Sequence, residues 1–210
     1  VIGITGSSKT TLANLIPRFY DSTCGTIKIG GIDIKTISLK ALRKYVAIVP
    51  QKASAFRMSI FDNIKFGSDA GKDDVERASS IAQCDEFILN KSQRFDTMIS
   101  EDGKNLSGGQ RQRLSIARAV ARKPKILILD DSMSALDNIT EKKLALALKE
   151  NLADTTTIVI SQRVSSLKFC DRIAVLSGGK LIACGTHSDL ILSSVDYQNI
   201  YNSQNMEETL

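Results

Sequence analysis

Residues 1–11 read VIGITGSSKTT, an apolar run that enters a glycine-rich turn and ends in Lys9 and Thr10 at the start of a helical pattern. A strand, a glycine-rich turn, Lys-Thr and a helix in this order are the context that a phosphate-binding loop requires. Backbone N–H groups of such a loop point at phosphate oxygens, the lysine reaches the terminal phosphates, and the threonine hydroxyl faces Mg²⁺. The residues that this pattern predicts to contact the phosphates are Gly3, Thr5, Gly6, Ser7, Ser8, Lys9, Thr10 and Thr11.

Ser8 departs from the template G-x-x-x-x-G-K-[ST], which has glycine at this position. A side chain here is expected to crowd a phosphate or to strain the turn, because glycine lets the backbone approach a ligand closely. The alternative is a chance turn in front of a helix. The strand before the turn and the Lys-Thr pair after it favour the phosphate loop.

Short apolar runs alternate with helical patterns along the chain. The runs are 1–4, 26–31, 46–50, 126–130, 156–161, 171–177 and 180–185. Apolar spacing indicates helices at roughly 9–18, 72–82, 107–122 and 139–152. Strands that alternate with helices predict an α/β fold with a mostly parallel sheet, here the core of a P-loop NTPase.

We interpret residues 1–210 as one domain with a helical insertion. The core is expected at about 1–65 and 123–195, the inserted helical subdomain at about 66–122, and a polar tail that frays at about 196–210. The chain starts without Met and is inside a motif within its first residues. At least one N-terminal strand is therefore expected to be missing from this fragment.

The composition is that of a globular chain, with 42% apolar residues, 24% charged residues and a net charge of +5. The basic excess favours anionic partners, but it does not choose between nucleotide phosphates, nucleic acid and acidic lipid. Four scattered cysteines without a CxxC pair argue against a zinc site or a disulfide framework and fit a reducing setting. One histidine, His187, excludes a site with several histidine ligands, and no apolar run has the roughly 18 residues of a membrane-spanning helix.

The segment KILILDDSMSALD, residues 125–137, ends a buried strand in two carboxylates. In open α/β sheets the ligand lies beyond the carboxyl ends of the strands. Asp130 at such an end, beside a phosphate loop, is placed to hold Mg²⁺ through water, and the next residue, Asp131, to orient the attacking water. Taken alone, the pair favours a turn or a helix cap before residues 132–137.

The segment LSGGQRQR, residues 106–113, predicts a second anion-binding helix start. Ser107 and Gln110 form an S-x-x-Q capping box, and Gly108 and Gly109 expose the first amides of the helix. Because the phosphate loop already serves one nucleotide, a spare site indicates a second nucleotide held partly by another subunit. Four arginines behind it are expected to form a solvated face: Arg111, Arg113, Arg118 and Arg122.

These stretches together resemble the nucleotide-binding domain of ATP-binding cassette (ABC) transporters over nearly the whole chain. Residues 3–10 are similar to Walker A, 126–131 to Walker B and 106–110 to the family signature. The resemblance implies that Gln51 is the Q-loop glutamine and that ATP and Mg²⁺ are the cofactors. The implied Mg²⁺ ligands are Thr10, Gln51 and Asp130, and the implied D-loop is Ser134, Ala135, Leu136 and Asp137.

Features outside these motifs resemble the exporter type of the family. They are Glu101 in ISEDG (99–103), which matches an acid before the signature, the segment 54–67, and GTHSDL (185–190). The resemblance implies a transmembrane domain fused upstream, a place on the cytoplasmic face of a membrane, and no nucleic-acid partner.

The chain departs from the family at its catalytic positions, with Asp131 for the catalytic Glu and Gln162 for the switch His. A displacement of about 1 Å can lower a rate on the order of 100-fold, and Asp is one methylene shorter than Glu. Gln162 can donate a hydrogen bond to a phosphate, but it cannot carry a proton. We expect slow hydrolysis at this chain's own site, while its intact signature completes the site of a second ABC domain, a different chain with Glu and His.

Other functions remain open at this stage. One alternative is that both substitutions are tolerated and turnover is normal. An ABC importer ATPase subunit, a soluble ABC ATPase of DNA repair or translation, and a nucleotide sensor without hydrolysis are the others. The exporter-type acid at Glu101 argues against the importer.

Overall fold

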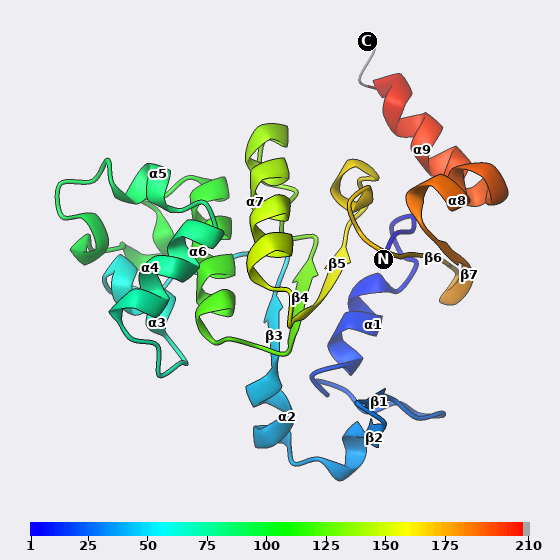
Figure 1. Ribbon diagram of the computed structural model, residues 1–210, viewed down its shortest axis with the longest axis horizontal. Coiled ribbons are helices and arrows are strands. Elements are labelled where there is room, and N and C mark those ends of the chain that lie inside the picture. The colour runs from blue at the N-terminus through cyan, green and yellow to red at the C-terminus, as the bar shows by residue number, and fades with distance from the viewer. Residues whose placement is uncertain (208–210) are drawn as a thin grey trace.

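Three apolar runs form the parallel sheet at the centre of the computed structural model, which describes residues 1–207 (Figure 1). The strands β3 (Val46–Val49), β4 (Ile126–Asp130) and β5 (Thr156–Ile160) lie side by side in the order β3-β4-β5. Leu127, Ile128 and Leu129 of the central strand are fully buried, as expected for a strand covered on both faces. The predicted α/β fold with a mostly parallel sheet is confirmed.

The start of the chain connects this sheet to a hairpin. Ile2 forms a parallel bridge with Val175, which belongs to β6 (Ile173–Ser177), and β6 pairs antiparallel with β7 (Lys180–Gly185). The strand predicted at 1–4 is thus reduced to one bridge, because the chain turns into the loop at Gly3. A Cβ at Gly3 would overlap the carbonyl oxygen of Leu176, so glycine is required there.

The run at 26–31 also shrinks, to a hairpin of β1 (Lys28–Ile29) and β2 (Ile32–Asp33). The turn consists of Gly30 and Gly31, with φ of 57° and 82°, a left-handed pair that glycine adopts without steric cost. Two consecutive glycines therefore end the strand that periodicity alone would continue.

The helices predicted from apolar spacing are present with slightly shorter bounds. They are α1 (Lys9–Leu15), α4 (Lys72–Ile81), α6 (Gly108–Ala121) and α7 (Asn138–Asn151). Shorter helices lack a full apolar period and were not predicted: α2 (Leu39–Tyr45), α3 (Ile60–Lys65), α5 (Asp85–Ile88) and α8 (His187–Ser193). Single 3₁₀ turns are η1 (Ile34–Thr36), η2 (Arg94–Asp96), η3 (Glu101–Gly103) and η4 (Ser165–Leu167).

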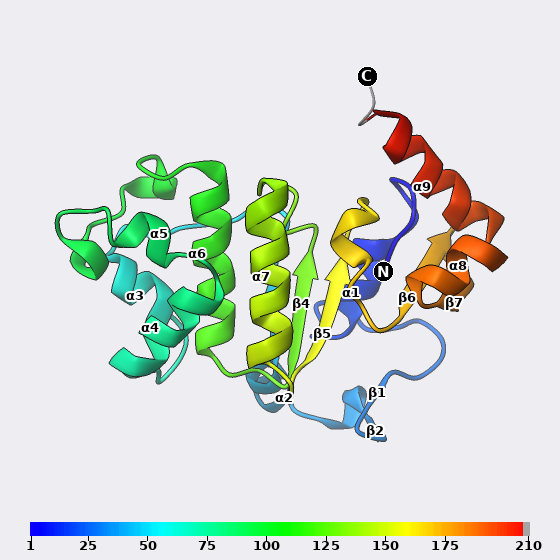
Figure 2. The same cartoon turned by 45° about the horizontal axis from the view of Figure 1, so that its top comes forward.

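Both views place α3 to α6 at one end of the molecule and α8 with the hairpin β6–β7 at the other (Figures 1 and 2). One buried apolar cluster joins Val75 of α4, Leu114 of α6 and Leu127 of β4, so the helical end packs directly on the sheet. The division into a core and a helical subdomain at 66–122 stays a prediction. Within residues 1–207 the structure has no helix that is both long and apolar enough to cross a membrane.

The arginines behind the signature bind backbone carbonyl groups instead of forming the expected solvated face. Their guanidinium groups donate to carbonyl oxygens, Arg111 to Leu106, Arg113 to Gln83, Arg118 to Asn63 and Arg122 to Arg43. Burial lowers the pKa of Arg118 to about 10. The prediction was wrong because three of the carbonyl partners lie in α2, in α3 and just after α4, far away in the sequence, which the periodicity of a single helix does not reveal.

The predicted polar tail is wrong over its described part, because it forms the helix α9 (Val195–Glu207). Tyr197 is fully buried and packs in one cluster with Ile2, Val164 and Leu167. The average polarity of the segment conceals one apolar stripe that docks on the body. Residues 208–210 of the predicted tail lie outside the described residues.

Candidate functional site

The glycine-rich loop and the carboxyl ends of β4 and β5 enclose a cleft of about 360 Å³. Its walls come from four separate parts of the sequence, as expected where parallel strands end at one edge of a sheet. The lining residues are Thr5, Gly6, Ser7, Ser8, Lys9, Thr10, Thr11, Gln51, Asp130, Asp131, Ile160, Ser161 and Gln162. The structure therefore brings together the predicted phosphate loop, the acidic strand end, Gln51 and Gln162, although sequence reasoning missed Ile160 and Ser161.

Lys9 is the cation of the cleft and is held over the loop. Its Nζ donates to the carbonyl oxygens of Gly3 at 2.7 Å and Ile4 at 2.9 Å, and to Ser7 Oγ at 3.2 Å. Burial lowers the pKa of Lys9, and the carboxylates of Asp131 and Asp130 partly offset this effect. An anion that entered the cleft would supply the opposite charge that this buried ammonium needs.

Ser8 adopts the backbone conformation that the template assigns to glycine. It precedes α1 with φ 68° and ψ 23°, in the left-handed region, and its side chain makes no capping hydrogen bond. A residue with a Cβ costs about 1–2 kcal/mol in this conformation. The predicted strain of the turn is thus located at a specific backbone angle.

Thr10 and Asp130 meet across the cleft although 120 residues separate them. Thr10 Oγ1 donates to Asp130 Oδ1 at 3.1 Å. Burial raises the pKa of Asp130, while the Thr10 hydrogen bond and the charge of Lys9 oppose this rise. A hydroxyl and a carboxylate at this separation are hard oxygen donors that suit Mg²⁺, which keeps several waters and takes few protein ligands.

Asp131 follows β4 with its backbone N–H bonded to Ile160 O at 2.9 Å and φ of 47°. Gln51 Nε2 donates to Asp131 Oδ2 at 3.0 Å, so the glutamine here contacts the second acid and not the Thr10–Asp130 pair. Burial raises the pKa of Asp131, and the nearby Asp130 charge raises it further. The cleft therefore contains two closely spaced acids whose repulsion a cation would relieve.

Gln162 lies on an exposed loop just after β5. Its side-chain oxygen accepts a hydrogen bond from Thr5 Oγ1 at 3.3 Å, which places the amide against the phosphate loop. Its backbone oxygen accepts a hydrogen bond from Gln204 of α9 at 2.6 Å. Sequence reasoning missed Gln204, and the only signal for it was the apolar stripe of the segment that contains it.

The predicted signature lies outside the cleft. Ser107 Oγ accepts from Gln110 N at 3.2 Å and Gln110 Oε1 accepts from Ser107 N at 3.0 Å, the capping box that the sequence predicted. Gly108 is exposed, whereas a Cβ at Gly109 would press on Ala135 O at 3.2 Å. The second glycine is therefore explained by close contact with the predicted D-loop.

The predicted D-loop links the acidic strand end to α7. Ser134 Oγ donates to Asp131 O at 2.8 Å, Leu136 is buried, and Asp137 caps α7 by accepting from the N–H of Thr140 at 2.9 Å. The loop thus runs from Asp131 to the neighbourhood of the signature. Ala135 at its tip is exposed.

His187 and Glu101 do not contribute to the cleft lining. His187 of α8 has its Nδ1 2.8 Å from the hydroxyl of Tyr197 in α9. Burial lowers the pKa of His187. Glu101 is exposed in η3. Within residues 1–207 no three His, Cys, Asp or Glu side chains are grouped to bind a metal.

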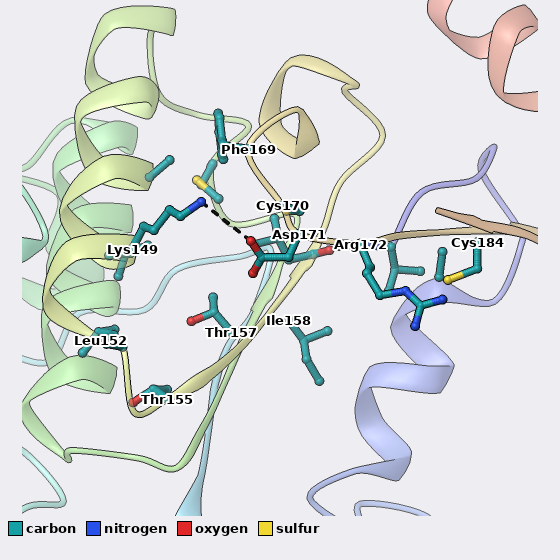
Figure 3. Close-up of a pocket in the computed structure, with 17 residues that line it drawn as sticks. Lys149, Leu152, Thr155, Thr157, Ile158, Phe169, Cys170, Asp171, Arg172 and Cys184 are labelled. Atoms are coloured by element: carbon teal, nitrogen blue, oxygen red, sulfur yellow. Dashed lines mark hydrogen bonds and ion pairs between the residues drawn. The ribbon is translucent and has the colours of Figure 1, made fainter. Parts of the chain in front are cut away.

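A larger cavity of about 570 Å³ lies between α7, β5 and the start of β6. Figure 3 shows Lys149 reaching toward Asp171, 3.7 Å away, with Arg172 and Cys184 on the side far from α7. None of the predicted motif residues lines this cavity. The smaller cleft is therefore the candidate functional site, because the predicted phosphate loop and the acidic strand end converge there.

A family model described as ABC transporter matches residues 1–134. The chain belongs to the ABC transporter family. The predicted membership is confirmed. The phosphate loop, Gln51, the signature and the acidic strand end lie within the matched range, and the predicted D-loop begins at its last residue, Ser134.

Two curated ABC relatives cover nearly the whole chain. The ATP-dependent lipid A-core flippase of Thiobacillus denitrificans is 41% identical over 97% of this chain, which corresponds to 36% of the flippase. ABC transporter B family member 19 of Arabidopsis thaliana is 40% identical over 100% of this chain and 17% of that protein. The chain thus spans about a third of the flippase and less of the plant transporter.

A solved ABC structure has the same fold. It is described as a bacterial Atm1-family ABC exporter with ATP bound, with a TM-score of 0.93 and 37% sequence identity. The match covers 97% of this chain and 36% of that chain. The likeness to ABC exporters therefore extends beyond the motifs to the arrangement of the elements.

Proposed function

We propose that this chain is the ATP-binding domain of an ABC exporter, placed at the cytoplasmic face of a membrane. The observation that carries the proposal is the Thr10–Asp130 contact at 3.1 Å in the cleft that also holds Lys9. A cation, a hydroxyl and a carboxylate at the mouth of a glycine-rich loop suit Mg·ATP and few other ligands. The exporter relatives support the transport function and the membrane location.

The main polar groups of the cleft each interact with a different part of Mg·ATP. The loop amides and the start of α1 receive phosphate oxygens, and Lys9 exchanges its loop carbonyl partners for the terminal phosphates. Thr10 and Asp130 would hold Mg²⁺, and the amide oxygen of Gln51 would be a further ligand for it. When bound, Mg²⁺ neutralises the charge that develops on the phosphates.

The finer proposal is that this cleft hydrolyses ATP slowly. Asp131 is the acid placed to orient the attacking water, and its carboxylate ends one methylene closer to the backbone than a glutamate would. Gln162 hydrogen-bonds the γ-phosphate through its amide but carries no proton that it can give or take. Together these residues bind the substrate and supply a weakened base.

A second ABC domain completes the assembly in this proposal. The exposed start of α6 at Ser107 and Gly108 presents amides to a nucleotide that the other domain holds. This partner is a different chain that carries glutamate and histidine at the two altered positions. A transmembrane domain is fused upstream of this chain. Its conformation is coupled through Gln51 to the closure of the two ATP-binding domains, as a population shift between open and closed states.

The test restores the two catalytic side chains in the full exporter. Asp131→Glu combined with Gln162→His is expected to raise phosphate release at this site on the order of 100-fold, because the base then reaches the water. To isolate this site, the partner's Walker B glutamate is replaced by glutamine. Asp131→Asn in that background serves as the matched control and is expected to give no such rise. A wild-type site that already turns over at the restored rate would contradict the impaired site.

The asymmetry has a separate test. Removing the partner's glutamate is expected to abolish nearly all turnover of the full exporter, while Asp131→Asn in this chain leaves most of it. Equal losses from the two changes would show two equivalent sites. Retention of Mg·ATP binding in either result would leave the assignment of the cleft intact.

A further inference from the structure

We propose that α9 positions the γ-phosphate contact of this site, with Gln204 as the positioning residue that fixes the loop carrying Gln162. This inference rests on the proposed function of the cleft. It assigns a role in ATP recognition to a helix that contributes no residue to the cleft lining. The role differs from helix docking, because Gln204 bonds the loop backbone directly.

Gln204 makes two hydrogen bonds to the loop with one side-chain amide. Its Nε2 donates to Gln162 O at 2.6 Å, and its Oε1 accepts from Val164 N at 2.9 Å. The amide thus binds the C=O of one loop residue and the N–H of the residue two positions later. A neighbouring β-strand would make the same pair of hydrogen bonds with the edge strand of a sheet. Since β5 ends at Ile160, the amide takes the place of a strand where the ladder has stopped.

The helix that carries Gln204 is firmly anchored. Tyr197, Ile200, Tyr201 and Gln204 recur at the spacing i, i+3, i+4 and i+7, so they share one face of α9. Tyr197 is fully buried and its hydroxyl lies 2.8 Å from His187 Nδ1. Lys168 Nζ lies 5.0 Å from the ring centroid of Tyr201. A rigid base of this kind can hold a loop in one place.

The other side of the same loop reaches the phosphate loop. Gln162 accepts from Thr5 Oγ1 at 3.3 Å, and Arg163 N donates to Ser161 Oγ at 3.0 Å. The side chain of Gln162 is exposed, so apart from the Thr5 hydrogen bond its backbone fixes where the amide lies. The Gln204 clamp therefore determines the position of a group that must meet the γ-phosphate. A change of about 1 Å in such a position is enough to weaken recognition.

The experiment compares nucleotides that differ at the γ-phosphate in the full exporter with Mg²⁺. Gln204→Met removes both hydrogen bonds and keeps the volume and apolar stripe of α9, so the helix is expected to remain docked. Binding of the nonhydrolysable analogue AMP-PNP is expected to weaken about three- to tenfold, the loss of one modest hydrogen bond. ADP binding is expected to stay unchanged, because ADP has no γ-phosphate.

The matched control is another glutamine of the same helix. Gln198 Nε2 donates to Ile191 O at 2.6 Å, so it docks α9 on α8 and not on the loop that carries Gln162. Gln198→Met is expected to leave the ratio of AMP-PNP to ADP affinity unchanged. A change in this ratio equal to that of Gln204→Met would overturn the specific role of Gln204.

A double-mutant cycle connects the clamp to its target. Gln162→Ala alone is expected to weaken the binding of AMP-PNP and to leave the binding of ADP unchanged. Adding Gln204→Met to this variant is expected to cause no further loss of AMP-PNP affinity. Additive losses, or equal losses of both nucleotides, would overturn the inference while nucleotide binding itself stays normal. Failure of the wild-type protein to bind either nucleotide would instead overturn the proposed function, and this inference with it.

Discussion

The helices α1 and α6 both begin after a serine, and the two starts are built in opposite ways. Ser8 before α1 has a left-handed backbone and makes no capping hydrogen bond with its side chain. Ser107 before α6 is extended at φ −68° and closes a full capping box with Gln110. The first start lies in a cleft with Lys9, whereas the second is exposed on the surface.

This difference indicates what each start can do alone. The start of α1 has backbone strain and lies beside a buried cation and a pair of acids, so the groups of a phosphate site converge there within one chain. The start of α6 satisfies two of its own orphan donors, and the guanidinium of the adjacent Arg111 is bound to the carbonyl oxygens of Gly103 and Leu106. It can therefore only complete a site whose charge comes from elsewhere.

The strongest way to break this comparison is to remove the cation of the first start. Lys9→Ala is expected to weaken Mg·ATP binding on the order of 100-fold, since hydrogen bonds to charged groups contribute up to about 3 kcal/mol. Titration of the purified protein with a fluorescent ATP analogue measures the loss. Lys40→Ala removes the same charge from an exposed position of α2 and is expected to have little effect. Similar losses of affinity in both variants would show that Lys9 acts only through the net charge of the protein.

Substitutions of the two serines are expected to have smaller effects, of opposite sign, on the stability of the fold. Ser8→Gly is expected to raise the free energy of unfolding by about 0.5–1 kcal/mol, because glycine relieves the left-handed strain. Ser107→Ala is expected to lower it by about 1 kcal/mol, because the cap is lost. Urea unfolding of both variants measures the two changes. A loss of stability in Ser8→Gly would show that the serine side chain contributes more than its backbone costs.

The smallest expected effect is on the stability of the nucleotide-free protein and comes from the paired acids Asp130 and Asp131. Burial and Asp130 raise the pKa of Asp131 above its ordinary 3.8, so the folded protein holds this proton more tightly than the unfolded chain. The resulting stability is present below pH 3.8 and is lost as the pH rises through the folded pKa. Asp131→Asn is therefore expected to be more stable than the wild type at pH 7, by less than about 1 kcal/mol at this partly exposed position.

Urea unfolding at a series of pH values follows this difference, which is expected to vanish as the pH falls through 3.8. Asp196→Asn, an exposed substitution outside the cleft, is the matched control and is expected to show no such dependence. A wild type that is more stable than Asp131→Asn at pH 7 would mean that the Gln51 hydrogen bond outweighs the repulsion.

Much of the candidate site was predictable because its chemistry is written in contiguous residues. The phosphate loop, the acidic strand end and the capping box each lie within about a dozen residues, where spacing alone specifies which groups share one turn or one helix start. The described part of the tail, 196–207, was misjudged because mean polarity was weighed above the stripe of Tyr197, Ile200 and Tyr201. The arginines behind the signature were misjudged because most of their carbonyl partners belong to other elements of the fold.

The sequence by itself determined which residues could bind phosphate, hold a cation and cap a helix, since these properties depend on residue type and local spacing. Only the tertiary structure decided which of them meet. The hydrogen bonds Thr10–Asp130 and Thr5–Gln162 span 120 and 157 residues, and the clamp of Gln204 on Gln162 spans 42. Such contacts depend on the order and register of the strands that bring distant loops to one edge of the sheet, which no local pattern encodes.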